Sequence, residues 1–340
     1  MRPAAGESAL AGVLVIDKPT GLTSHDVVQR LRRTLQTRRI GHAGTLDPLA
    51  SGVLVVMIGE ATKLAPFLTI EDKSYAALVG LGVGTSTLDA EGEITEQSAL
   101  PAWLSEPAER AARLGAALGL ERARTEQSPP LYSAIKVGGR TGYSRARAGE
   151  QFELPPRPVV VHELALRLPE PSPGGQAGAD GSMAASSLAD LELTLTVGKG
   201  YYVRSLARDL GARLGLPAHL RALRRLRSGP FGIERAIPLT TDRASLLAGL
   251  LGLGDTARLA LPAVELRERG AARALLGQPL ERDDCVALPA AGVPAAWFDP
   301  TGRLVAVGEH TADGLGRVLR GFVQSEPAPA SDAGEVSERS

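Results

Sequence analysis

One short segment limits what this chain can fold into. The sequence "GHAGTLDPLASG", Gly41 to Gly52, is rich in small residues, and it sets one carboxylate, Asp47, directly before a proline and after the histidine His42. Small residues fill a core poorly, so we expect a loop whose backbone something approaches closely. Taken alone, an Asp-Pro pair between glycines is most often an ordinary turn.

The chemistry open to Asp47 is also limited. The chain has no G-x-x-x-x-G-K-[ST] pattern, which excludes a Walker phosphate loop, and no carboxylates or histidines cluster near Asp47 as a metal site needs. Nucleophilic or acid–base catalysis by one ionised aspartate remains, and this chemistry needs a cationic partner to hold the charge.

A partner for Asp47 is found in "KGYYVRSLARDLG". We expect Tyr202 and Arg204, two residues apart, to lie on one face of a strand. An aromatic ring beside a guanidinium can hold an unstacked base and a carboxylate. A core tyrosine next to a surface arginine is the alternative interpretation.

Length and composition point to one large domain with a smaller appendage, because the chain has 340 residues and is 44% hydrophobic. No apolar run approaches the roughly 20 residues that cross a bilayer, and the first residues lack the apolar segment of a secretion signal. Cys285 is the only cysteine, so an internal disulfide and a Cys-cluster zinc site are excluded. These features favour a cytoplasmic protein that does not bind a membrane.

Charge is balanced overall but clustered locally. Residues 27–46 contain five arginines and no acid, residues 133–149 contain one lysine and three arginines and no acid, and residues 201–227 contain seven arginines and one acid. A solvated helix face explains any one such stretch. Three of them around a Gly-rich loop favour contacts to phosphates.

Hydrophobic periodicity predicts the main elements. We expect strands at 12–19, 53–59, 74–83, 157–168 and 189–204, and helices at 24–35, 61–68, 101–118, 142–150 and 205–227, with a break at Gly215 and Pro217. Thr23 and Asp26 predict a capping box at the first helix. Residues 256–323 read as a β-rich module with a hairpin turn at 299–302. Residues 169–187 form a low-complexity insertion, and 1–9 and 325–340 are expected to be disordered tails.

Five motifs, in order, resemble those of one known family. "GHAGTLDPLASGVL" is similar to the catalytic-aspartate motif of the TruB family, the bacterial tRNA pseudouridine-55 synthases. "GVLVIDKPTGLTSHDVV", "SPPLYSAIKVGGRTGYSRARAGE", "GKGYYVRSLARDLGARLG" and "LRRLRSGPF" are similar to its other motifs, and together they cover most of residues 12–232. The resemblance implies an α+β pseudouridine synthase fold, with a mixed, largely antiparallel sheet flanked by helices. It also implies a catalytic domain at 10–250 and a PUA-like RNA-binding module at 256–323.

The resemblance also implies roles for the catalytic residues. Asp47 would be the catalytic aspartate, and Arg204 the arginine that keeps it ionised. Tyr75, in "DKSYAALV", would stack on the target base and help to deprotonate its C5.

The same resemblance implies a substrate-binding set. Tyr202 would be a second aromatic of the pocket, and His42 would help to displace and hold the flipped nucleotide. Gly44 and its small neighbours would leave room for RNA. Lys18, in the Lys-Pro of the first motif, belongs to this set, with an architectural role expected more than direct chemistry.

The chain departs from the family pattern at one position near the site. Ser86 stands where the family usually has an aspartate, while Asp89 is retained. We expect this departure to affect a secondary contact or the loop structure and not catalysis.

The resemblance predicts a monomeric, stand-alone enzyme that binds the T-arm of tRNA and isomerises uridine 55 to pseudouridine. It would need no metal, organic cofactor or obligatory protein partner. The carboxylate either attacks C1′ or abstracts the 2′ proton, and the sequence does not choose between these routes. Three alternatives stay open: a guide-RNA-dependent synthase, a non-catalytic tRNA-folding chaperone, and an enzyme of small-molecule nucleotide metabolism.

Overall fold

The computed structural model describes residues 10–322 except 134, 138, 143, 144, 146, 147, 149, 151, 168–188, 240 and 241. The expected tails at 1–9 and 325–340 and the insertion at 169–187 lie outside these residues. Much of the helix expected at 142–150 also lies outside them.

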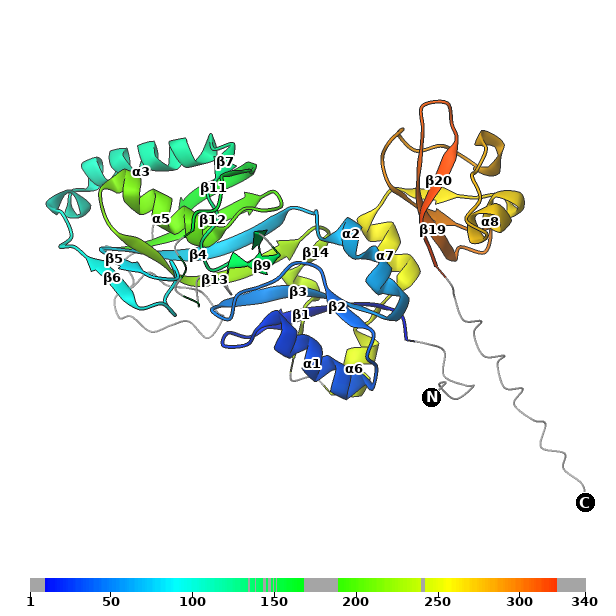
Figure 1. Ribbon diagram of the computed structural model, residues 1–340, viewed down its shortest axis with the longest axis horizontal. Helices are drawn as coiled ribbons and strands as arrows, with labels where there is room; N and C mark the ends of the chain where they lie inside the picture. Colours follow the sequence, from blue (N-terminus) through cyan, green and yellow to red (C-terminus); the bar gives the residue numbers. More distant parts are fainter. Residues whose placement is uncertain are drawn as a thin grey trace, which may run out of the picture.

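A mixed sheet of ten strands forms the larger part of the molecule (Figure 1). Its main path runs β11-β12-β4-β13-β3-β1-β15, and three further strands pair with β13, β1 and β3. Two pairs, β13 with β3 and β1 with β15, are parallel, and the other described pairs of this sheet are antiparallel. The sheet therefore confirms the predicted α+β class. Its strands are β1 (Gly12–Lys18), β2 (Ile40–His42), β3 (Ala50–Ile58), β4 (Lys73–Leu81), β11 (Val161–Arg167), β12 (Asp190–Val197), β13 (Ala218–Ser228), β14 (Phe231–Gly232), β15 (Ile237–Pro238) and β16 (Leu251–Gly252).

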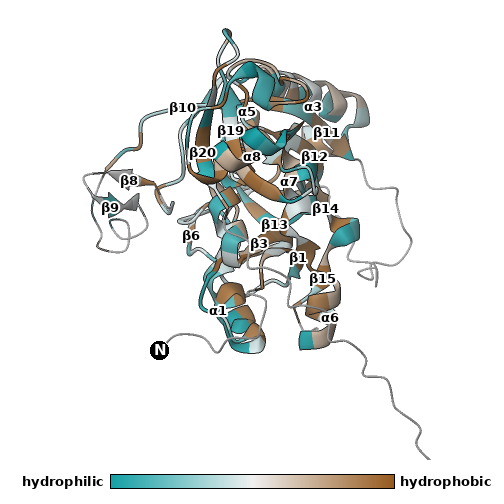
Figure 2. Cartoon of the chain, turned by 90° about the vertical axis from the view of Figure 1, so that its right-hand side faces the viewer, coloured by the Kyte–Doolittle hydropathy of each residue, from teal (hydrophilic) through white to brown (hydrophobic). Residues whose placement is uncertain are grey.

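Four helices contribute to the hydrophobic core of this sheet: α1 (Ser24–Leu35), α3 (Pro107–Arg122), α5 (Val203–Leu214) and α6 (Arg243–Ala248). Helix α1 begins where Thr23 and Asp26 form the predicted capping box. Its apolar residues at helical spacing are buried, so the helix shows hydrophobic residues next to the sheet and hydrophilic ones away from it (Figure 2). The rule that predicted this helix from sequence therefore also explains its packing.

Short elements connect these layers. They are η1 (Gly59–Leu64), α2 (Ala65–Leu68), β5 (Val83–Thr85), β6 (Ile94–Gln97), η2 (Ala102–Ser105), β7 (Glu126–Gln127), β8 (Lys136–Val137), β9 (Arg140–Thr141), β10 (Arg157–Pro158) and η3 (Ile233–Arg235). Strands β5 and β6 form a hairpin around residues 86–93, and β7 pairs with β10. Both pairs matter for the site described below.

A smaller strand-rich unit follows at the C-terminal end (Figure 1). Its four-stranded sheet runs β17-β18-β19-β20, and the hairpin predicted at 299–302 joins β18 to β19. The unit also contains helix α8, which the sequence analysis did not predict. Its elements are β17 (Ala263–Glu265), α8 (Glu268–Leu275), η4 (Arg282–Asp284), β18 (Ala295–Phe298), β19 (Leu304–His310) and β20 (Gly316–Gly321), and α7 (Leu253–Ala260) precedes them.

The C-terminal unit shares a core with the large sheet. Strand β18 alternates, so that Trp297 lies in the unit's own hydrophobic cluster and Phe298 lies in a second cluster. That second cluster also contains Val13 of β1 and Val55 of β3, on the side of these strands opposite Leu14 and Leu54. Through this cluster the C-terminal unit packs against the face of the large sheet that carries Val13 and Val55.

Two secondary-structure predictions were wrong. Residues 218–228 form strand β13 and not a helix. Its buried residues are spaced by two and then three, because register shifts interrupt the pairing with β4 after Leu220 and after Arg225. Such bulges imitate helical spacing in the sequence. Residues 201–204 are not a strand either, since β12 ends at Val197 and Tyr202 is the N-cap of α5.

Candidate active site

Asp47 lies in the loop between β2 and β3, and its carboxylate meets the guanidinium of Arg204. The distance from Asp47 Oδ2 to Arg204 Nε is 2.9 Å. The arginine side chain is 8% exposed and the aspartate side chain 41% exposed. The carboxylate therefore reaches the surface with its cationic partner buried behind it. On this side the carboxylate is open to water.

Arg204 joins two further segments, the hairpin 83–97 and the segment around Tyr132, to this loop. Its Nη1 donates to the carbonyl of Thr87 at 3.1 Å and its Nη2 to the carbonyl of Tyr132 at 2.9 Å. A second carboxylate, that of Asp89, lies 3.6 Å from Nε. Because each guanidinium nitrogen has a partner, the orientation of the group facing Asp47 is fixed.

Backbone contacts fix the loop itself. Arg225 of β13, which is buried, donates from Nη2 to the carbonyl of Gly44 at 3.0 Å and from Nε to that of Val53 at 2.6 Å. Ser24 Oγ, also buried, accepts from the N–H of Leu46 at 2.8 Å and donates to its carbonyl at 3.1 Å. The residues before Asp47 are thus held from a strand and from the first turn of α1.

The residue after Asp47 is held from β1. The carbonyl of Pro48 accepts from the N–H of Gly21 at 2.8 Å, and Lys18 Nζ lies 3.5 Å from it. Lys18 also donates to the carbonyls of Pro19 and Leu22, at 2.9 and 2.7 Å. The loop carrying the carboxylate is therefore fixed on both sides of Asp47.

Helix α5, which carries Arg204, is held at its N-cap. The N–H of Tyr202 donates to Gln127 Oε1 at 2.8 Å, and Gln127 Nε2 donates to the carbonyl of Tyr202 at 3.1 Å. Burial raises the pKa of the Tyr202 phenol, the nearby Arg157 and Arg204 lower it, and Asp47 raises it. Tyr202 and Arg204 thus meet at the start of a helix and not on the predicted strand, but the ring remains within electrostatic reach of Asp47.

Family models match most of the catalytic part of the chain. The model described as "TruB family pseudouridylate synthase (N terminal domain)" matches residues 32–203, and "tRNA pseudouridylate synthase B C-terminal domain" matches residues 204–244. The tRNA pseudouridine synthase B of Thermobifida fusca (strain YX) is 41% identical over 303 residues, which are 88% of this chain and 94% of that protein. A protein of the same name from Thermus thermophilus is 43% identical over 310 residues, 86% of this chain and 93% of that protein.

The chain belongs to the TruB family. A solved structure, "Crystal Structure of a Cbf5-Nop10-Gar1 Complex", contains a chain with the same fold, at a TM-score of 0.66 and 24% identity, covering 92% of this chain and 84% of that one. The matched family models end at residue 244, before the strand-rich C-terminal unit. The PUA-like assignment of that unit therefore stays a prediction.

Tyr75 and His42, the other side chains assigned from the TruB motifs, flank this loop. Tyr75 is on β4, where it pairs with Arg225 of β13, and it is 8% exposed, in the same hydrophobic cluster as Leu46. His42 ends β2, and its Nδ1 is buried without a hydrogen-bond partner among the described residues. Burial lowers the pKa of His42, and Arg225 and His25 lower it further, so the imidazole is neutral at pH 7.

Gly44 and Lys18 have structural reasons for their identity. Gly44 has a φ of 92°, which favours glycine, and its carbonyl is bound by Arg225. Lys18 has no exposed surface, and burial lowers its pKa to about 8, although Asp47 raises it. Its position behind the loop fits the architectural role expected for it.

The hairpin 83–97 supplies Asp89 and accommodates Ser86. Asp89 is 4% exposed, and its Oδ1 accepts from Thr87 Oγ1 and from the N–H of Glu91. Ser86 Oγ accepts from the N–H of Glu93 at 3.1 Å, a local bond across the hairpin. Burial raises the pKa of Glu91, and Asp89 and Asp47 raise it further, so this acid is close to the site.

Three residues at the site were missed by sequence reasoning: Ser24, Gln127 and Arg225. Arg225 was counted in a basic stretch, but nothing in the sequence separates it from its arginine neighbours. Ser24 and Gln127 act on backbone groups far along the chain, and such contacts have no local signature.

Within the described residues, no three His, Cys, Asp or Glu side chains are grouped as a metal ion would require. No helix in the described part of the chain is long and apolar enough to cross a membrane.

Proposed function

We propose that this chain isomerises uridine 55 in the T-loop of tRNA to pseudouridine, with Asp47 as the catalytic carboxylate. The pair of Asp47 and buried Arg204, 2.9 Å apart, carries this proposal. An aspartate whose charge is held by a fixed guanidinium, and which still reaches the surface, can meet a ribose presented from outside. The relatives named tRNA pseudouridine synthase B, at about 40% identity over most of the chain, support tRNA as the substrate.

The reaction needs an unstacked nucleotide in the site. The N1–C1′ bond breaks, the uracil turns, and C5 bonds to C1′, after which C5 loses its proton and N1 gains one. Asp47 acts either by attack on C1′ or by removal of the 2′ proton. Extracting the uridine from the T-loop costs a few kcal/mol of unstacking. Bound RNA then covers the exposed side of Asp47, which strengthens the field of the carboxylate at the sugar.

The neighbouring side chains have complementary roles in this proposal. Tyr75 stacks on the uracil and helps to remove the C5 proton, and Tyr202 forms a second wall of the pocket. Neutral His42, whose Nδ1 has no hydrogen-bond partner among the described residues, helps to displace and hold the flipped nucleotide. Gly44 lets the RNA backbone approach, and Lys18 fixes the loop from behind.

We further propose that the chain works alone, as a monomer in the cytoplasm, with a catalytic domain at 10–250 and a PUA-like RNA-binding module at 256–323. The guide-dependent alternative is not favoured, because the chain is 41–43% identical over most of its length to the relatives named tRNA pseudouridine synthase B. It is only 22–24% identical to the chains from Cbf5 complexes and from an H/ACA RNP that share the fold.

The experiment that tests the function uses the purified chain and unmodified tRNA, with pseudouridine mapped by nucleotide position. We expect product at uridine 55 without guide RNA or protein partner. The Asp47→Asn variant should form no product and still bind tRNA. Wild-type product from that variant would refute the role of Asp47, and product only with an added guide RNA would refute the stand-alone assignment. Accelerated tRNA folding without product would favour the chaperone alternative.

A further inference from the structure

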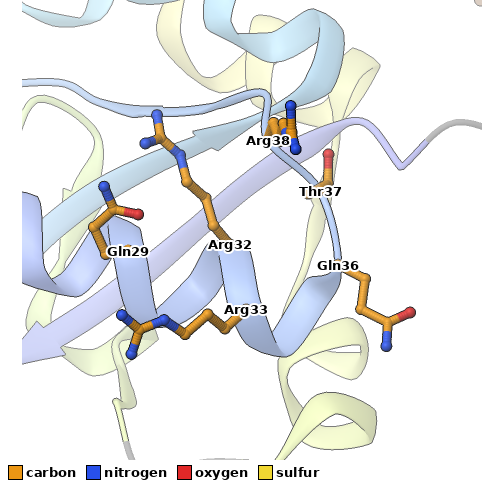
Figure 3. Close-up of a pocket in the computed structure, with 6 residues that line it drawn as sticks. All are labelled: Gln29, Arg32, Arg33, Gln36, Thr37 and Arg38. Carbon is orange, nitrogen blue, oxygen red and sulfur yellow. The ribbon is translucent and has the colours of Figure 1, made fainter. Parts of the chain in front are cut away.

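Helix α1 carries, at the end away from the Asp47 loop, an opening that the proposed site does not use. This opening, the arginine hollow, has a volume of about 590 Å³. Its lining is seen in Figure 3 and consists of Gln29, Arg32, Arg33, Gln36, Thr37 and Arg38. All six residues come from the last turns of α1 and the segment that leads to β2.

The arginines of the hollow differ from most arginines elsewhere. Arg221, Arg224 and Arg269 each face a carboxylate at 3 Å or less. Arg32, Arg33 and Arg38 form no ion pair with an acid among the described residues. Glu60, the acid that follows β3, pairs with Arg39 and Lys63 instead. The hollow therefore keeps its positive charge.

One of these guanidiniums is fixed in place. Arg32 Nη2 donates to the carbonyl of Ile40 at 3.0 Å, while its Nε is buried and has no partner in the described part of the chain. Arg33 and Arg38 are exposed. The hollow thus combines one positioned guanidinium with two that can adjust to a ligand.

The lining identifies the class of ligand. All six side chains are polar or charged, whereas pockets for small molecules are lined mainly by apolar groups. Arginine, glutamine and threonine side chains are those that contact phosphate oxygens of nucleic acids. We propose that the arginine hollow binds backbone phosphates of the RNA substrate, away from the flipped nucleotide. This inference rests on the proposed function for the identity of the RNA.

The hollow and the Asp47 loop are at opposite ends of one rigid element. Ser24, in the first turn of α1, holds both backbone groups of Leu46 next to Asp47. A helix of 12 residues is about 18 Å long, at about 1.5 Å per residue. The hollow is lined from Gln29 onward, so it holds phosphates at a set distance, about 8–18 Å along the helix axis, from the turn that fixes the Asp47 loop.

The test compares two double variants that each remove two positive charges. In Arg33→Gln/Arg38→Gln the exposed arginines of the hollow are lost and Arg32 is kept. In the control, Arg113→Gln/Arg167→Gln, the arginines are 51% and 71% exposed and pair with Glu109 and Glu192. The association constant for binding of full-length tRNA is measured at several salt concentrations for both variants and for the wild type. Thermal unfolding then checks that each variant is folded.

We expect the hollow variant to lose about two units of the log–log salt slope and to bind about 10-fold or more weakly at 0.1 M salt. The loss should be the same for tRNAs of different sequence, because phosphates carry no sequence information. The control should bind as the wild type does. An unchanged slope in the hollow variant, or an equal change in the control, would overturn the proposal. A wild type that binds tRNA but makes no pseudouridine would instead count against the proposed function, since binding is measured independently of product.

Discussion

Gln127 and Tyr202 are joined by two hydrogen bonds between a side-chain amide and a backbone, at 2.8 and 3.1 Å. The pair connects strand β7 to the start of α5, two residues before Arg204. Gln127 is 2% exposed, so both bonds are largely shielded from water. The orientation of the guanidinium that faces Asp47 therefore depends on a glutamine 77 positions earlier in the sequence.

Replacing Gln127 by leucine should reduce turnover more than tRNA binding. The change removes the partner of the Tyr202 N–H and one of the two donors to the Tyr202 carbonyl, which still accepts from the N–H of Leu206. An unpaired buried N–H costs about 1–3 kcal/mol in the free energy of unfolding. The change also frees the first turn of α5, while the basic surface that meets the RNA is unchanged. Urea denaturation measures the first effect, and single-turnover kinetics with tRNA-binding titrations measure the second. Gln127→Glu, which keeps the acceptor for Tyr202 N–H, should be intermediate; equal losses in affinity and turnover would contradict this role.

Arg204→Lys should lower the rate of pseudouridine formation by roughly 100-fold, because a displacement of about 1 Å at a reacting group can cost this much. Lysine keeps the charge but cannot bond Asp47, Thr87 and Tyr132 at once, since it lacks the planar fork. The measurement is the single-turnover rate at saturating tRNA. Arg213→Lys, on the same helix and paired with Glu121, is the control and should react at nearly the wild-type rate. A similar loss in both variants would assign the effect to the stability of the helix.

Gly52→Ala should destabilise the fold by more than about 3 kcal/mol, since backbone strain at such a φ alone costs about 1–3 kcal/mol. Gly52 has a φ of 96°, and a Cβ placed there would lie 2.2 Å from the carbonyl oxygen of Arg225 on the neighbouring parallel strand. Gly44 has a similar φ of 92°, but its Cβ would meet side-chain atoms and no backbone, with Lys73 Cε at 3.2 Å and Arg225 Nη1 at 3.6 Å.

The Gly44→Ala variant is therefore a matched control that carries the strain without a backbone clash. It should lose about 1–2 kcal/mol. Urea unfolding of both variants gives the two costs. Equal costs would show that the approach of β13 to β3 is not what requires glycine at Gly52.

Lys18→Met should change how stability depends on pH. The pKa of Lys18 is about 8 in the folded protein and 10.5 when unperturbed, so between these values the unfolded chain binds the extra proton. The contribution of Lys18 to the free energy of unfolding is therefore lowest below pH 8. It rises as the pH increases to 10.5, by at most about 1.4 kcal/mol per pH unit.

Urea unfolding between about pH 7.5 and 10 should show a shallower rise for Lys18→Met than for the wild type. Lys73, whose pKa burial also lowers to about 8, should give the same change when replaced by methionine. All other groups titrate in both proteins, so the difference between them isolates the lysine. Parallel curves for wild type and variant would contradict the low pKa.

The elements that were predicted well from the sequence have an uninterrupted pattern of apolar residues. The first helix and the strands at β1, β3 and β4 follow unbroken apolar patterns, and the capping box marks a start for α1. Strand β13 was missed because its bulges break the alternation of two. The strand expected at 189–204 was extended into the start of helix α5, because the N-cap of α5 follows β12 through a short glycine-containing turn.

The candidate site was predictable only for side chains in recognisable motifs. The meeting of Asp47 and Arg204, 157 positions apart in the sequence, follows the expectation drawn from the family resemblance. The contacts of Ser24 with Leu46 and of Arg225 with Gly44 depend on how α1 and β13 pack around the loop. Such contacts arise from tertiary structure, and no local pattern encodes them.

The apolar cluster that joins Phe298 to Val13 and Val55 has a consequence for how the protein would bind an RNA molecule. A unit attached through a flexible linker could move with its ligand, but one whose strands pack in a common apolar cluster with the main sheet cannot rotate without exposing that cluster to water. The distance from the C-terminal strands to the carboxylate of Asp47 is thus fixed, and any RNA that contacts both must match that distance.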